Sequence, residues 1–126
     1  MSKSTNTPRA NYIGAPEYFI LNQLCCILVE SFGLCTYLVG SSITSLDFRD
    51  VDIRTILDDE EFDKLFKDNT TTHNPFWSLL CISVSEYLSS KSGLKVDYQI
   101  QRRTETNKTY NGSRQAIGFF IQKKTN

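Results

Sequence analysis

The sequence is poor in histidine and in paired cysteines, which argues against two common kinds of site. His73 is the single histidine among 126 residues, and no local signature around it indicates a Ser-His-Asp or Cys-His arrangement. Cys25, Cys26, Cys35 and Cys81 include no C-x-x-C pair, whereas a structural zinc ion needs about four suitably placed ligands. We therefore expect buried thiols in place of a zinc centre.

The sequence also lacks a long hydrophobic run and an excess of either charge. No apolar stretch approaches the roughly 20 residues that are needed to cross a bilayer. Residues 1–10 are polar and do not form the charged start and apolar run of a secretion signal. We expect a cytoplasmic protein that makes no contact with membranes.

The composition is that of an ordinary globular protein, with 40% hydrophobic and 22% charged residues. At this length we expect a single domain with no separate domain for a second substrate. Residues 1–16 are polar and contain prolines, which indicates a mobile or loosely docked arm before a domain spanning residues 17–126. Residues 102–126 are basic overall, whereas residues 47–68 are acidic. Such segments are most often solvated surface, although they also suit metal or phosphate binding.

Two segments have the periodicity of long helices. In residues 17–32 the apolar residues recur at three- and four-residue steps, and Gly33 is suited to end that helix. Asn74 and Pro75 are suited to the cap and first position of a longer helix that runs to Gly93.

Three shorter segments are predicted to be strands. Residues 34–39 form a continuous apolar run, and residues 50–57 and 94–101 alternate between apolar and polar side chains. Asp58 and Glu61 have the spacing of a capping pair at the start of a short helix. The order of helices and strands predicts an α/β (α+β) fold, a small mixed sheet packed by helices.

The alternation of the predicted strands places carboxylates together. Val51 and Ile53 face one side of their strand and Asp50 and Asp52 face the other, while Asp97 projects away from the apolar row of the third strand. Like charges on one face need either open solvent or a bound cation, and oxygen ligands suit magnesium or manganese. A solvated acidic edge strand would have the same pattern, so Asp-x-Asp alone is weak evidence.

The residues after the first predicted strand suit phosphate binding. Gly40 lets the backbone approach a ligand closely, and the amide and hydroxyl groups of Ser41 and Ser42 are hydrogen-bond donors for triphosphate oxygens. The Asp-x-Asp strand begins eight residues after Ser42.

Together these motifs resemble the nucleotidyltransferase superfamily that includes DNA polymerase beta and the minimal nucleotidyltransferases. The family signature is an apolar residue, Gly-Ser or Gly-Gly, a short spacer and then Asp-x-Asp. Here it reads Val39-Gly40-Ser41 followed by Asp50-Val51-Asp52-Ile53, and Asp97 is similar to the third family carboxylate. The resemblance covers roughly residues 17–101. The chain also looks like small nucleotidyltransferase-like proteins of bacteria and their phages.

The resemblance implies a transfer of a nucleoside monophosphate from a nucleoside triphosphate to an acceptor hydroxyl. Asp50, Asp52 and Asp97 would hold Mg²⁺ or Mn²⁺ and act in catalysis, with Asp97 helping to deprotonate the acceptor. Gly40, Ser41 and Ser42 would position the outer phosphates.

Arginines near the carboxylates are further candidates for the nucleotide site. Arg49 and Arg54 flank the Asp-x-Asp strand and are placed to touch phosphates, or to pair with the acids. Arg102, Arg103 and Arg114 lie in the basic segment, where a nucleotide contact and plain solvation are both open.

The sequence leaves several functions open. A catalytically silent relative would use the same fold to bind a nucleotide or a protein partner, as an antitoxin or regulator does. An RNA-binding module would use the basic segment with Tyr110, Phe119 and Phe120. The acceptor of an active enzyme would be a small molecule, a protein or RNA, and it would meet the core directly, a second subunit of a homodimer or a partner protein.

Overall fold

The computed structural model describes residues 11–67 and 74–119, and within them helices and strands follow one another as the sequence predicts, with two additional short helices and a short fourth strand. The predicted loop at 68–73, including His73, and Phe120 lie outside the described residues. The elements are α1 (Glu17–Phe32), β1 (Thr36–Val39), α2 (Ser41–Thr44), β2 (Val51–Leu57), α3 (Asp59–Phe66), α4 (Pro75–Ser92), β3 (Val96–Arg102), α5 (Arg103–Thr109) and β4 (Gln115–Ala116).

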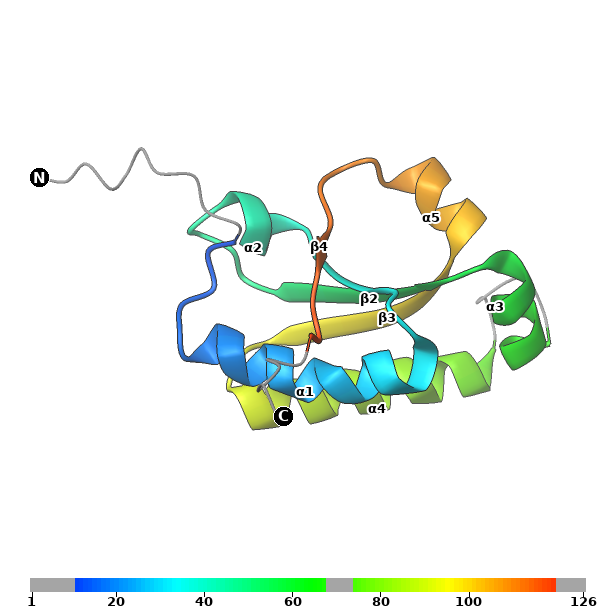
Figure 1. Ribbon diagram of the computed structural model, residues 1–126, viewed down its shortest axis with the longest axis horizontal. Coiled ribbons are helices and arrows are strands. Elements are labelled where there is room, and N and C mark those ends of the chain that lie inside the picture. Colours follow the sequence, from blue (N-terminus) through cyan, green and yellow to red (C-terminus); the bar gives the residue numbers. More distant parts are fainter. Residues whose placement is uncertain (1–10, 68–73, 120–126) are drawn as a thin grey trace, which may run out of the picture.

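The strands form a mixed sheet in the order β3-β2-β1-β4. β1 runs antiparallel to both β2 and β4, whereas β2 and β3 run parallel. Figure 1 shows α1 and α4 side by side against one face of this sheet, and α2 and α5 on its other side. The predicted fold class, a small mixed sheet packed by helices, is therefore confirmed.

The hydrophobic core lies between the sheet and the α1/α4 layer. Both long helices have the predicted bounds: α1 ends at Gly33, and the Asn74 side chain caps α4 by accepting a hydrogen bond from Trp77 N at 3.0 Å. The strands contribute their apolar rows, and α1 contributes the stripe read from its sequence. The fully buried members of this core include Leu21, Cys25, Leu38, Val51, Ile53, Leu88, Tyr98 and Ile100.

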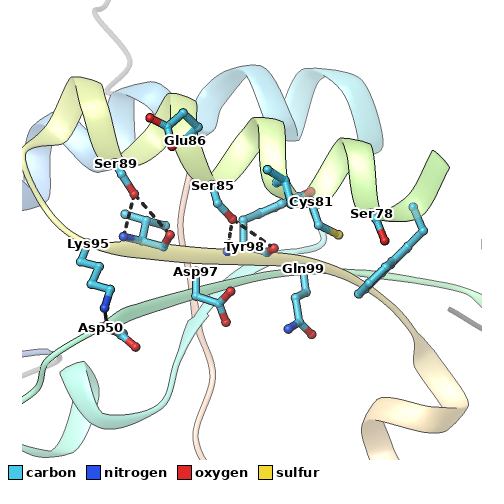
Figure 2. A pocket seen from close by; sticks show the side chains of 13 residues that line it. Asp50, Ser78, Cys81, Ser85, Glu86, Ser89, Lys95, Asp97, Tyr98 and Gln99 are labelled. Carbon is cyan, nitrogen blue, oxygen red and sulfur yellow. Dashed lines mark hydrogen bonds and ion pairs between the residues drawn. The ribbon is translucent and has the colours of Figure 1, made fainter. Parts of the chain in front are cut away.

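The outer edge of β3 is covered by side chains of α4 that recur every fourth residue. Ser89 Oγ accepts from Val96 N at 2.9 Å and Ser85 Oγ accepts from Tyr98 N at 2.8 Å. Figure 2 shows both hydroxyls reaching from the helix to the strand. Further along, Trp77 Nε1 donates to Ile100 O at 2.8 Å, and Cys81 stands between Trp77 and Ser85 in the same series. These side chains take the place of a neighbouring strand, since an open edge would leave polar backbone groups unpaired.

All three predicted strands begin later than the sequence prediction, β1 and β3 by two residues and β2 by one, and β3 ends one residue later at Arg102. β1 begins at Thr36 and not at residue 34, because the chain turns after α1 and leaves Leu34 74% exposed. At the start of α3, Asp58 occupies the cap position but makes no capping hydrogen bond. Its carboxylate accepts instead from Arg103 Nε at 2.8 Å, so the predicted capping pair does not form.

The basic segment that follows β3 begins with helix α5. Its residues form no apolar stripe, and the helix is held by polar contacts with α3: Thr104 N donates to Asp59 Oδ1 at 3.0 Å and Arg103 binds Asp58. Polar contacts between segments far apart in the chain leave no periodic signal, which is why the sequence did not indicate this helix.

Both described ends of the chain are docked on the domain. Ile13 is buried, and Tyr12 N donates to Ser42 O at 2.7 Å, so the arm predicted over residues 1–16 is anchored in its described part. At the other end, the side-chain oxygen of Asn22 on α1 accepts from Gly118 N at 2.7 Å. Ile117 is buried beside this contact.

Candidate functional site

The site is built on the face of the sheet opposite the α1/α4 layer. In the parallel pairing of β2 and β3, Asp52 lies directly beside Asp97. Period-two alternation turns both carboxylates away from the buried row that holds Val51 and Tyr98. Figure 2 shows Asp97 pointing away from α4 while the helix covers the strand from the other side. The predicted convergence of these two carboxylates is confirmed.

Arg54 joins the two carboxylates. Its Nη2 atom lies 3.1 Å from Asp97 Oδ2 and 3.9 Å from Asp52 Oδ1. The distance between these two carboxylate oxygens therefore cannot exceed the sum of the two values. Its Nη1 atom donates to the backbone oxygens of Asp97 at 2.7 Å and Ile53 at 3.0 Å. The guanidinium group is thus fixed between the two acids and balances their charge.

Asp50 lies just before β2, next to Asp52 and Asp97 on the open face of the sheet. These three carboxylates are called the carboxylate row, or the row, below. Its Oδ1 atom is 3.5 Å from Nζ of Lys95, as the dashed line in Figure 2 marks. That oxygen is buried and forms no hydrogen bond within the described residues, because the lysine contact is an ion pair without hydrogen-bond geometry. The lysine side chain is highly exposed, so solvent weakens this pair.

The carboxylates influence one another electrostatically. Burial raises the pKa of Asp52 above its usual value, and the negative charges of Asp97 and Asp50 raise it further. Arg54 acts in the opposite direction on the same pKa. The negative charge of Asp52 is therefore less favourable in the folded protein than in the unfolded chain.

Gly40 closes one side of the row. A Cβ atom at this position would lie 2.4 Å from Asp52 Oδ2, and the residue has φ of +85°, so only glycine fits here without displacement. The predicted close approach of this backbone to a phosphate ligand stays a prediction, and the structure places Gly40 directly against the Asp52 carboxylate. The two serines that follow belong to α2: Ser41 is exposed, while Ser42 is fully buried and its hydroxyl has no partner among the described residues.

The two candidate arginines beside the Asp-x-Asp motif differ. Arg54 is central to the site, whereas Arg49 is exposed in the connection before β2 and forms no ion pair with any described residue. The structure therefore brings together Gly40, Asp52, Arg54 and Asp97, with Asp50 next in the row, and it leaves Arg49 and Ser41 at the surface.

The carboxylates have the donor chemistry that magnesium and manganese prefer. Within residues 11–67 and 74–119, however, no three His, Cys, Asp or Glu side chains are gathered as a ready ligand group. Arg54 and Lys95 offset part of the negative charge of these carboxylates instead. The Oδ1 of Asp50, which has an ion pair with Lys95 but no hydrogen bond, is the oxygen that a cation would satisfy. Asp50, Asp52 and Asp97 are therefore the residues suited to hold a cation once Arg54 and Lys95 move aside.

Two cavities border the carboxylates and differ in charge. The larger, about 610 Å³, runs along β3 and α4 and includes Asp50, Asp97, Glu86 and Lys95 in its lining. The smaller, about 210 Å³, lies toward α5, and its lining includes Gly40, Asp52, Arg54, Thr106, Tyr110 and Arg114. Acidic groups dominate the first lining, whereas two guanidinium groups face one carboxylate in the second.

Tyr110 and Arg114 line the site, although the sequence indicated only that they belong to a segment with basic and aromatic residues. Their hint is the Asn111-Gly112 turn, a pair that allows the chain to reverse and return toward the sheet. A Cβ atom on Gly112 would lie 2.6 Å from the Tyr110 hydroxyl oxygen, so the glycine lets this turn close over the ring.

Comparison of the chain with protein-family models, with curated proteins and with solved structures finds no match. Among the helices that the structure describes, none combines the length and the apolar character needed to span a bilayer. The geometry of the site is therefore the basis for assigning a function.

Proposed function

We propose that the chain is a cytoplasmic, metal-dependent nucleotidyltransferase that moves a nucleoside monophosphate from a nucleoside triphosphate to an acceptor hydroxyl. The observation that carries this proposal is the adjacent register of Asp52 and Asp97 beside the backbone of Gly40. Carboxylates and an unhindered glycine backbone at one point combine a site for cations with a site for phosphate.

In this proposal each of the two cavities binds a different substrate. The smaller cavity receives the triphosphate, because its guanidinium groups and the Gly40 amide attract phosphate oxygens. The larger cavity receives the acceptor, whose hydroxyl comes next to Asp97. Asp52 lines the first cavity and Asp97 the second, so the reacting atoms meet at the row between them.

The transfer follows from that placement. The acceptor oxygen forms a bond to the α-phosphorus while the bond from that phosphorus to the bridging oxygen breaks, and pyrophosphate leaves. The acceptor proton passes to the Asp97 carboxylate, which lies on the acceptor side. A magnesium or manganese ion held by Asp50, Asp52 and Asp97 would supply positive charge for the developing negative charge on phosphate.

A second candidate function is a catalytically silent nucleotide- or protein-binding module. The observation that favours it is Arg54, which occupies the position between Asp52 and Asp97 with well-formed hydrogen bonds. A guanidinium group that stayed there would leave no room for a shared cation, and nucleotide would then bind without transfer.

Labelled nucleoside triphosphates separate these two functions. Purified protein is incubated with cell extract and with triphosphates labelled at either the α- or the γ-phosphate, with MgCl₂ or with EDTA. Transfer of the α-label alone, and only with magnesium, is expected for a nucleotidyltransferase, whereas γ-label transfer would indicate a phosphotransferase. Asp52→Asn should abolish the signal, and Asp47→Asn should retain it, since Asp47 is exposed and outside the row. Triphosphate binding without any labelled product would favour the silent module.

A further inference from the structure

The smaller cavity has a wall that the nucleotidyltransferase motif does not account for. Gly40, Asp52 and Arg54 come from the sheet, while Tyr110 and Arg114 come from the segment after α5. This second group consists of a hydroxyl and a cation, two chemical groups that bind phosphate oxygens.

The Tyr110 hydroxyl is placed on the backbone amide of Gly40. Gly40 N donates to Tyr110 Oη over 3.4 Å, a long and therefore weak hydrogen bond. The hydroxyl itself donates to Ser113 O at 3.0 Å, which holds the ring over its own turn. The amide that a phosphate oxygen would use is thus engaged by a weak and replaceable partner.

Arg114 is held in position without a negatively charged partner. Its Nη2 atom donates to Asn107 Oδ1 at 3.0 Å, and its guanidinium carbon lies 5.9 Å from the centre of the Tyr110 ring. None of the described carboxylates forms an ion pair with it. The charge of Arg114 therefore remains available to an anion.

The other arginine of this cavity and the two other arginines of the described basic segment are already paired. Arg54 binds Asp97, Arg102 binds Asp63 at 3.0 Å, and Arg103 binds Asp58 at 2.8 Å. Arg114 differs from all of them in having neutral partners only, although it belongs to the same basic segment. This contrast distinguishes it from a solvated basic tail.

We propose that Arg114 binds the terminal phosphates of the nucleotide and that the Tyr110 hydroxyl is a latch on the Gly40 amide, which the incoming phosphate displaces. This inference rests on the proposed function for the identity of the ligand, but it concerns binding and not transfer. It assigns to the segment after α5 the recognition of a polyphosphate anion.

Titration calorimetry with inorganic tripolyphosphate, at low ionic strength and with EDTA, tests the inference on the full chain. Wild-type protein should bind, and Arg114→Gln should weaken binding by about tenfold or more, the scale of a lost charge-assisted contact. Tyr110→Phe removes the latch but keeps the ring beside Arg114, so it should bind about two- to fivefold more tightly. Arg103→Gln removes the same charge from the same segment outside the cavity and should stay within about twofold of wild type.

Several results would overturn the inference. No tripolyphosphate binding by wild type, or equal weakening by Arg103→Gln and Arg114→Gln, would remove the specific site. Weaker binding by Tyr110→Phe would make the hydroxyl a ligand and not a latch. Thermal unfolding confirms that each variant is folded, and Arg114→Lys, which keeps the charge without the planar fork, should fall between wild type and Arg114→Gln.

A parallel titration with ATP identifies the part of the nucleotide that Arg114 contacts. Equal losses for ATP and tripolyphosphate are expected for a phosphate contact, whereas a loss confined to ATP would indicate the base or sugar and reject the assignment. The result is independent of catalysis: absence of α-label transfer would refute the proposed enzyme while leaving Arg114-dependent anion binding intact, and the reverse outcome would refute only the inference.

Discussion

The two faces of the β2/β3 pair differ strongly in solvent exposure and in the chemistry of their side chains, whereas the two strands resemble each other. One face, covered by α1 and α4, holds Val51, Ile53 and Tyr98 without measurable contact with solvent. The other face holds Asp52 and Asp97, whose side chains are 26% and 49% exposed. Successive residues of one strand therefore belong either to the core or to the site, and the consequences of a substitution should depend on its face more than on its position along the chain.

The covered face contains a series of buried hydroxyl groups, and hydrogen bonds between them compensate the cost of burying them. Tyr98 Oη donates to Thr55 Oγ1 at 2.6 Å, and Thr55 Oγ1 lies 2.9 Å from Thr36 Oγ1. Burial raises the pKa of Tyr98, so its hydroxyl stays protonated as the donor that this series requires. On the open face, by contrast, Asp50 Oδ1 lacks a hydrogen bond. The buried Ser42 hydroxyl in α2 likewise has no partner, so both unsatisfied side-chain groups among the described residues lie away from the face that α1 and α4 cover.

The largest effect is expected on the covered face. Ile53→Ala removes a fully buried side chain from the middle of β2 and should lower the free energy of unfolding by about 3 kcal/mol. Urea denaturation measures this change, and Leu46→Ala, at an exposed position, should stay within about 0.5 kcal/mol of wild type. A similarly small loss for Ile53→Ala would contradict the division between the two faces.

A substitution one strand away but on the open face should affect transfer and not stability. Asp97→Asn keeps the shape of the side chain but removes the group that accepts the acceptor proton, so it should reduce transfer by about a hundredfold, or about 2.7 kcal/mol. Triphosphate binding should stay within about tenfold of wild type, because the interaction is made mainly in the transition state. Rates and affinities measured on the same preparation check this split. Unchanged transfer would reject the catalytic role of Asp97.

The difference between the faces was largely visible in the sequence. Period-two alternation was enough to place Asp52 and Asp97 on the face opposite Val51, and the pairing of β2 with β3 then brought them together. What alternation could not reveal is that Arg54 binds both acids, because a residue's partner across strands depends on register, which the sequence of one strand does not determine.

The sequence was least informative where polar contacts replace apolar packing. Helix α5 depends on bonds between Thr104 and Asp59 and between Arg103 and Asp58, which join segments far apart in the chain. The edge contacts of α4 come from Ser85 and Ser89, which are two of six serines in this helix. Their four-residue spacing therefore does not stand out in the sequence, and the sequence did not indicate that they pair with the backbone of β3.

The edge of β3 lies between the two faces, and its disruption should have an intermediate effect. Ser89→Ala leaves the N–H of Val96 without its acceptor at 2.9 Å and should cost about 1–2 kcal/mol of unfolding free energy. Ser90→Ala on the exposed side of the same helix corrects for the helix preference of alanine and should cost less than about 0.5 kcal/mol. Hydrogen exchange at Val96 should accelerate only in the first variant. Equal stability of the two variants would show that solvent replaces the serine without loss.

The smallest effect concerns the charge on Asp52, and its sign follows from the raised pKa of that carboxyl. A folded-state pKa above the ordinary 3.8 means that protonation favours the folded protein. The stability from protonated Asp52 is therefore complete below about pH 3.8 and lost as the pH rises through the higher folded value. Asp52→Asn should unfold at a slightly higher temperature than wild type at pH 7, and this advantage should shrink as the pH falls toward 4, whereas exposed Asp47→Asn should show no such trend. If Asp52→Asn is instead less stable at neutral pH, the attraction of Arg54 exceeds the cost of burial, and the open face is stabilised by its charges much as the covered face is by its packing.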